Sequence, residues 1–212
     1  MKRISFAAVL AAVLCMALCA CAPRHAAQPI EEDISVGIAP FTQPMSTADM
    51  LLGQLPEKAG KMPADMALQL DRDFSMALRK NTKRRTVALP HRNVPAGNAM
   101  HNAVSAAALP KWVAYGKQNK VRLLVVPQVL NWEERRGSAA GVTEAAAVCI
   151  VFYMVDVERG EIVTRSVTEE KQVGLLDDLS RVGSFFKRHG AWITAEEMAQ
   201  EAMVKAIKEL GL

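Results

Sequence analysis

Two apolar runs decide the fold of this chain: Val121-Arg-Leu-Leu-Val-Val-Pro-Gln-Val-Leu130 and Glu144-Ala-Ala-Ala-Val-Cys-Ile-Val-Phe-Tyr-Met-Val-Asp-Val157. Both are too continuously apolar for strands with one face in water, so we predict adjacent strands of a sheet that is covered on both faces. Proline is a poor residue for the interior of a strand, and we expect Pro127 to mark the far end of the first strand or a bulge.

The second run leads into a β-hairpin. Residues 158–161 (Glu-Arg-Gly-Glu) are typical of a tight turn, and residues 162–172 alternate between apolar and polar side chains. Cys149 lies inside the apolar run, which favours a buried, inert thiol over a reactive one.

The remaining elements follow from periodicity and turn residues. We predict further strands at 33–41 and 86–89, helices at 63–81, 109–119, 175–189 and 194–210, and a long loop at 42–62 with at most a short helix. The residues Thr194-Ala-Glu-Glu197 form a capping box, and Gly211 is a stop signal. The predicted fold class is α/β (an α+β mixed sheet) of about five strands with helices packed against it, in the order β-α-β-α-β-β-β-α-α.

The N-terminus has the layout of a secretory signal. Lys2 and Arg3 precede an almost unbroken apolar run, Ile4 to Leu18, which is followed by Leu18-Cys-Ala-Cys21. The run is shorter than the roughly 20 residues that cross a bilayer, and Pro23 follows it closely, so secretion is favoured over a membrane span. We predict a signal peptide at 1–20, a tether at 21–32 and a single domain at 33–212.

Leu18-Cys-Ala-Cys21 resembles the lipobox of bacterial lipoproteins, with Cys19 as its one departure from the commonest pattern. The resemblance implies that Cys21 is acylated and begins the mature chain; an ordinary signal peptide is the alternative. The lipid would hold the protein to the periplasmic face of a membrane. Ala22 follows the cysteine where an inner-membrane retention signal often has aspartate, so the sequence resembles that of outer-membrane lipoproteins at this position. Cys149 is then the one thiol left, so no intramolecular disulfide forms.

The domain also resembles a known module in the order and pattern of four stretches. These are Ile34-Ser-Val-Gly-Ile-Ala-Pro-Phe41, Val87-Ala-Leu-Pro90, Asn119-Lys-Val-Arg-Leu-Leu-Val-Val-Pro127 and Asp156-Val-x-x-Gly-Glu-Ile-Val163. They are similar to the α/β module of the N-terminal domain of the Tol-system β-propeller protein and of curli-secretion and penicillin-binding-protein-activator lipoproteins. The resemblance implies an envelope assembly factor or regulator that binds partners; the loop at 42–62 and the helix at 175–189 depart from the pattern.

Local motifs for catalysis or metal binding are missing from the sequence. The four histidines (25, 91, 101 and 189) show no metal-ligand spacing, and no Gly-x-Ser-x-Gly or Gly-x-Gly-x-x-Gly occurs. A formal net charge of +4 does not indicate a nucleic-acid binder. These absences favour a non-catalytic protein without cofactor or metal, and the resemblance implies that it binds an envelope protein or a cell-wall component. The alternative is a periplasmic hydrolase or small-ligand-binding protein with a dispersed site.

Two charged stretches are candidate contact sites. Trp132, Arg135 and Arg136 combine an aromatic with arginines near a glycine, which is the composition of an interaction hot spot. The alternative is a tryptophan folded back on the sheet beneath a salt-bridged rim. Residues 79–85 carry five cations, which suit either an anionic surface or a solvated helix C-terminus.

Overall fold

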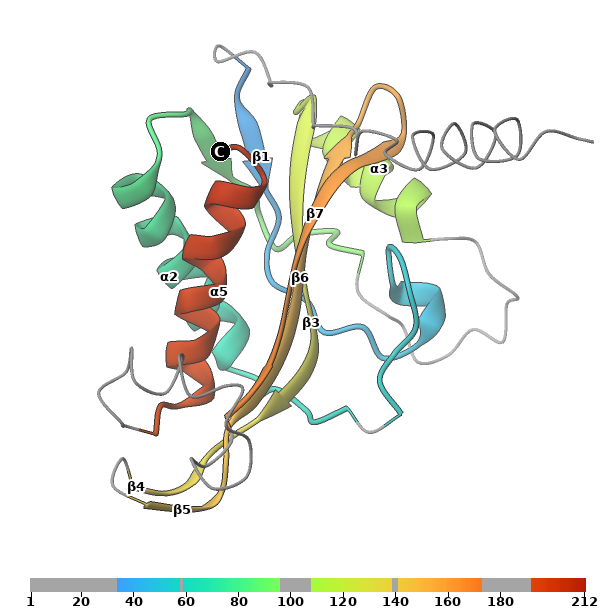
Figure 1. Cartoon of the computed structure of the whole chain (residues 1–212). Coiled ribbons are helices and arrows are strands. Elements are labelled where there is room, and N and C mark those ends of the chain that lie inside the picture. Colours follow the sequence, from blue (N-terminus) through green and yellow to red (C-terminus); the bar gives the residue numbers. More distant parts are fainter. Residues whose placement is uncertain (1–33, 58, 96–107, 139–140, 173–191) are drawn as a thin grey trace, which may run out of the picture.

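The computed structural model describes residues 34–57, 59–95, 108–138, 141–172 and 192–212. Within these ranges the chain forms a five-stranded mixed sheet with helices on both faces, as Figure 1 shows. The described elements are β1 (Val36–Ile38), the short helix η1 (Thr47–Asp49), α2 (Met66–Asn81), β2 (Thr86–Ala88), α3 (Ala108–Gln118), β3 (Leu123–Glu133), β4 (Arg136–Ser138), β5 (Gly141–Glu144), β6 (Ala147–Asp156), β7 (Glu161–Lys171) and α5 (Ala195–Glu209). The predicted α/β class is confirmed. The helix predicted at 175–189 lies outside the described residues.

The strand order in the sheet is β2-β1-β3-β6-β7. β1 pairs in parallel with β2 and β3, whereas β3, β6 and β7 form an antiparallel meander. The two apolar runs, residues 121–130 and 144–157, thus form neighbouring central strands. Val125 and Val151 are both buried, as strands covered on two faces require.

The two faces of the sheet carry separate cores. On one face α2 and α5 lie side by side and pack against the sheet through Phe74, Met198 and Met203. On the other face α3 covers the sheet through Trp112 and Tyr115. Both cores consist mainly of aliphatic and aromatic side chains, so the packing on the two faces of β3 and β6 is stabilised mainly by the hydrophobic effect.

Residues 42–57 and 59–62 run beside β3, and Met50 and Leu51 pack into the core on the second face. The amide of the buried Gln128 donates from Nε2 to the Asp49 carbonyl (2.9 Å) and accepts from the Leu51 N–H at Oε1 (3.2 Å). Further along, the Gly60 N–H donates to Asn131 Oδ1 (2.6 Å). The backbone of β3 beyond the short strand β1 also finds its partners here: the Val129 N–H donates to the Thr42 carbonyl (2.8 Å) and the Trp132 N–H donates to the Gly60 carbonyl (3.3 Å).

Pro127 corrects one expectation, since it lies in the middle of β3 and β3 continues to Glu133. Its carbonyl accepts from the Thr42 N–H, on the side where β1 has already ended at Ile38. In a strand the N–H and the carbonyl of one residue point to the same side. The N–H that proline lacks would therefore point to the side of Thr42, where neither β1 nor β6 needs a donor from it.

α5 begins as its sequence predicts. Thr194 is the N-cap and its hydroxyl accepts from the Glu197 N–H (3.1 Å), while the Glu197 carboxylate accepts from the Thr194 N–H (2.7 Å). Gly211 takes φ +70° just after the helix, a conformation that glycine adopts without steric cost.

Candidate functional site

The predicted contact residues lie at one tip of the domain. Beyond the main sheet, β4 and β5 form a two-stranded antiparallel ribbon, in which Arg136 pairs with Glu144. This ribbon extends the β3–β6 pair beyond the two apolar runs, which end at Leu130 and begin at Glu144.

Trp132 is a core residue in this structure. It lies in β3, is 2% exposed and belongs to the core beneath α2 and α5. Its Nε1 donates to Glu134 Oε1 at 2.8 Å, which satisfies the polar edge of the indole. This placement matches the alternative of a ring folded back on the sheet, and it corrects the expectation of an indole available to a partner.

The two arginines of the predicted site have different surroundings. Arg135 is half-buried and its guanidinium donates to the carbonyl of Trp192, which joins the ribbon to the segment before α5. Arg136 is exposed over 73% of its side chain and forms an ion pair with Glu144 at 3.0 Å. Arg136 is therefore the accessible member of the predicted trio.

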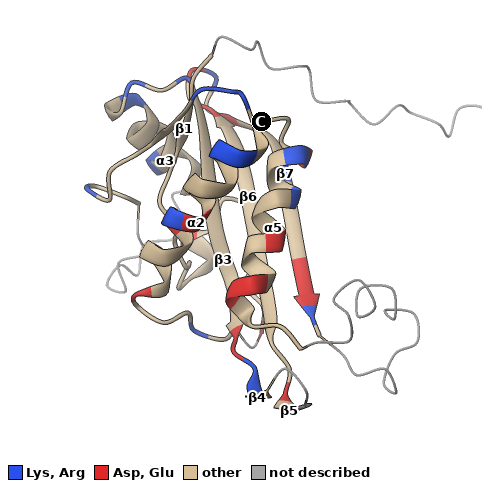
Figure 2. Ribbon diagram, turned by 90° about the vertical axis from the view of Figure 1, so that its left-hand side faces the viewer, with Lys and Arg blue, Asp and Glu red and all other residues tan. Residues whose placement is uncertain are grey.

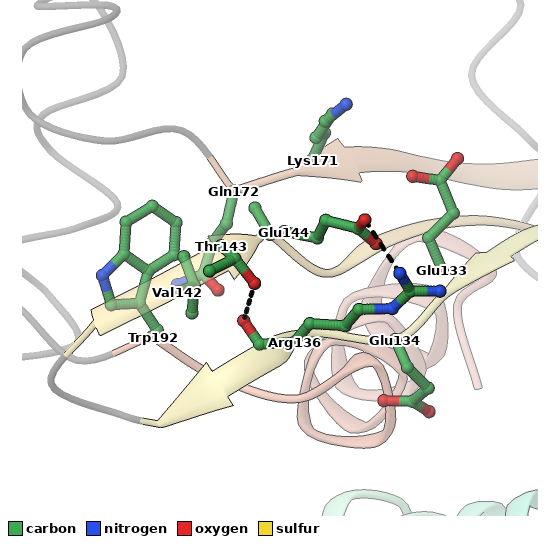
Figure 3. A pocket seen from close by; sticks show the side chains of 10 residues that line it. Glu133, Glu134, Arg136, Val142, Thr143, Glu144, Lys171, Gln172 and Trp192 are labelled. Carbon is green, nitrogen blue, oxygen red and sulfur yellow. Dashed lines mark hydrogen bonds and ion pairs between the residues drawn. The ribbon is translucent and has the colours of Figure 1, made fainter.

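A hollow of about 730 Å³ opens between this ribbon and the end of β7, and Figure 3 shows its side chains. Its lining consists of Glu133, Glu134, Arg136, Val142, Thr143, Glu144, Ala145, Lys171, Gln172 and Trp192. Of these residues only Arg136 belongs to the contact site predicted from the sequence. The opposite charges of Arg136 and Glu144 on either side of Gly137 and Gly141 are the signal that points to a charged hairpin.

The described lining of this hollow does not hold a nucleophile with a base. No histidine or cysteine is among the described lining residues, and the Thr143 hydroxyl donates to the carbonyl of Arg136 at 3.2 Å. Carboxylates and cations beside apolar side chains suit polar contacts with a partner surface. They do not form the nucleophile–base pair that acyl transfer needs.

A second polar cluster centres on Asp71 of α2. Its Oδ1 accepts from the Phe41 N–H (2.8 Å) and its Oδ2 lies 2.9 Å from His91 Nε2. Burial raises the pKa of the Asp71 carboxyl, which the bond from Phe41 and the proximity of His91 oppose. Through Phe41 and His91 the cluster joins α2 to the loops that follow β1 and β2. The nearby Ser75 hydroxyl donates to the Asp71 carbonyl (2.8 Å) and not to a base, so the cluster does not form a catalytic triad.

The part of the chain that the structure describes contains no cluster of metal ligands and no exposed thiol. No group of three or more potential ligands gathers within the described ranges. His91 pairs with Asp71, and the other three histidines lie outside those ranges. Cys149 is buried as predicted, and burial, followed by the charge of Glu169, raises its pKa to about 11.

The N-terminal predictions concern residues outside the described ranges. The signal peptide, the lipobox with Cys21 and the tether remain predictions. Of the helices that the structure describes, none combines the length and the hydropathy needed to cross a bilayer.

No family model and no curated protein matches the chain by sequence. Solved structures do match by shape. The PelC dodecamer from Paraburkholderia phytofirmans has a TM-score of 0.50 at 12% identity, covering 87% of this chain and 92% of PelC. A dodecamer of a PelC variant from the same organism, in another crystal form, scores 0.51 at 11% identity and covers 87% and 93%.

Lipoprotein GNA1162 from Neisseria meningitidis scores 0.40 at 8% identity, over 74% of this chain and 94% of that one. At these identities the likeness concerns architecture alone. The chain has the fold of PelC across almost the whole length of both proteins.

Proposed function

We propose that this chain is a bacterial lipoprotein that acts in the assembly or regulation of the cell envelope by binding a partner, without catalysis. In this proposal Cys21 is acylated and holds the domain at the periplasmic face of a membrane, and Ala22 favours the outer membrane. The lipobox Leu18-Cys-Ala-Cys21 supports the anchor, because each buried acyl methylene contributes about 0.8 kcal/mol to membrane binding.

The observation that carries partner binding is the shared fold. PelC builds a dodecamer from this architecture, so the same layers can present surfaces for stable protein contacts. A further copy of this chain, another envelope protein and a cell-wall component are the partner classes in the proposal.

The ribbon tip is the surface that we assign to the partner. Arg136 and Glu144 are both exposed there, beside the hollow that Lys171 and Trp192 help to line. Arginine and tryptophan concentrate binding energy when a partner removes water from them. In this arrangement Trp132 packs in the core next to the ribbon, and the hydrogen bond from Arg135 to the Trp192 carbonyl joins the ribbon to the segment before α5. The alternative of a dispersed hydrolase site gains no support from the described lining.

The test uses a photo-crosslinking amino acid at Thr143, which is exposed in β5, in the full-length protein in intact cells. The matched control carries the same amino acid at Leu68, an exposed position of α2 far along the chain from the tip. We expect a discrete adduct from position 143 that Arg136→Ala removes, and none from position 68. Equal adducts from both positions, or none from position 143 in membrane-bound protein, would contradict the proposed surface.

A further inference from the structure

One end of the domain gathers cations, and the chain enters the domain at that same end. β1 begins there, since Val36 lies opposite Thr86 of β2 and Leu123 of β3. The C-terminus arrives at this end as well: Gly211 and Leu212 line a hollow of about 350 Å³ together with Thr82, Lys83 and Arg84. Cys21, thirteen residues before Ile34, is therefore joined to the domain at the cationic end.

Two connections supply most of the positive charge. Residues 79–85, from the last turn of α2 to the start of β2, carry five cations and no acidic residue. Residues 117–122, from the end of α3 to the start of β3, carry Lys117, Lys120 and Arg122 and again no acidic residue. Figure 2 shows these blue segments together at the end of the sheet where β1 starts. We call these two segments the basic end.

The acidic side chains near the basic end have cationic partners of their own. Glu158 lies 3.5 Å from Arg122, and Arg159 lies 3.9 Å from Asp156 and 3.6 Å from Glu161. Further acidic residues at this end are Glu209 near the end of α5 and, in the sequence directly before Ile34, residues 31–33 (Glu-Glu-Asp). All these acidic residues together are still fewer than the eight cations of the basic end with Arg159, so the balance of charge at this end stays positive.

The opposite end of the domain has the reverse balance. The first turn of α5 carries Glu196 and Glu197, Glu133 and Glu134 lie at the end of β3, and Glu169 and Glu170 precede Lys171 at the end of β7. With Glu144 they outnumber the cations of this end, which are Lys61, Arg135, Arg136 and Lys171, and Figure 2 shows red segments there beside a few blue ones. The charge is therefore polarised along the strands, with the positive pole at the entry of the tether.

From this arrangement we infer that the basic end docks on the anionic phospholipid headgroups of the bilayer in which the acyl chains are anchored. The inference rests on the proposed function, because the anchor at Cys21 is what keeps the basic end close to a membrane. Each cation that reaches an anionic surface strengthens the contact about fivefold, and the effect extends only over a Debye length of about 10 Å. The ribbon tip, at the other end of β3 and β6, then points away from the membrane and toward a partner.

The test reconstitutes the full-length acylated protein into vesicles of neutral phosphatidylcholine or of phosphatidylcholine with about one third phosphatidylglycerol. An Asn81→Cys variant carries a fluorophore at the end of α2, and Thr143→Cys carries the same label on the ribbon. Cys149 is buried and does not compete for the label. A quencher attached to lipid headgroups then reports which label lies at the membrane.

We expect strong quenching at position 81 on anionic vesicles, little on neutral vesicles, and none at position 143. Salt at about 0.5 M, where the Debye length falls to roughly 4 Å, should reverse the quenching while the protein still floats with the vesicles. Removing three exposed cations with Lys80→Gln, Lys83→Gln and Arg85→Gln should weaken docking about fivefold per charge.

The matched control removes three exposed cations elsewhere, with Lys61→Gln, Arg136→Gln and Lys171→Gln, and should leave quenching at position 81 unchanged. Both triple variants should melt like the wild type, which excludes misfolding. Equal quenching on neutral and anionic vesicles, or equal losses in both triple variants, would overturn the inference while the anchor stands. Failure to float with neutral vesicles would overturn the anchor, and the inference with it.

Discussion

Replacing Trp132 with alanine tests whether this residue serves the fold. The indole is 2% exposed and lies in the core beneath α2 and α5. Truncating a buried aromatic residue to alanine costs about 3–5 kcal/mol, and loss of the bond to the exposed Glu134 adds at most about 1 kcal/mol. A typical domain is stable by about 5–15 kcal/mol, so the variant should lose a large share of its stability.

The measurement is urea unfolding of the wild type and the variant, followed by far-ultraviolet circular dichroism. The matched control is Arg136→Ala, close by in the chain. Its guanidinium is exposed and its ion pair with Glu144 is a surface pair, so its unfolding free energy should change by less than about 0.5 kcal/mol. The crosslinking assay should give the opposite order, with Arg136→Ala losing the adduct and folded Trp132→Ala keeping it.

Two results would refute this reasoning. A Trp132→Ala variant within about 1 kcal/mol of the wild type would show that the indole does not fill the core. A folded Trp132→Ala variant that loses the adduct, beside an Arg136→Ala variant that keeps it, would return the indole to the partner surface.

Further changes test other parts of the molecule. Cys21→Ser should move the protein out of the membrane fraction or leave its precursor uncleaved, and a mature N-terminus with an unmodified Cys21 would contradict the anchor. Val125→Asp, which places a carboxylate in a fully buried position of β3, should cost several kcal/mol in a thermal melt, and near wild-type melting would disprove the assigned core. Gly60→Ala places a Cβ 2.1 Å from the Trp132 carbonyl oxygen, so it should displace the covering segment and destabilise by more than an exposed substitution does, which urea unfolding would show. With its pKa raised to about 11, Cys149 should resist alkylation at about pH 8 and react once urea unfolds the chain; rapid native labelling would contradict its burial.

The central sheet was predictable because its sequence signals are long and consistent. Continuous apolar runs mark β3 and β6, which are covered on both faces, and the alternation in β7 marks a strand with one face in water. The capping box at Thr194 located the start of α5 because two reciprocal hydrogen bonds need those residue types three positions apart.

The covering segment at 42–62 was not predictable beyond its lack of regular structure. It is held by side chains of β3 that lie far along the chain, above all Gln128, whose amide bonds the Asp49 carbonyl and the Leu51 N–H. A glutamine between apolar residues does not by itself indicate which backbone groups it serves. The close approach of Gly60 to the Trp132 backbone likewise depends on tertiary contacts.

The side chain of Trp132 shows most clearly why the candidate site could not be predicted from the sequence. The register between β3 and β6 shifts between Val129 and Asn131, so one extra residue, Leu130, is accommodated in β3. Alternation alone would place residue 132 on the face opposite Val129, but the bulge reverses the phase and brings both side chains into the same core. A bulge adds twist and bends its strand, which explains how β3 continues past the expected end at Leu130 and turns into the ribbon. The bulge therefore places Trp132 in the core, while Arg136 lies in the exposed ribbon that follows. Two residues that look like one hot spot in the sequence thus have separate roles, Trp132 in stability and Arg136 in the proposed contact.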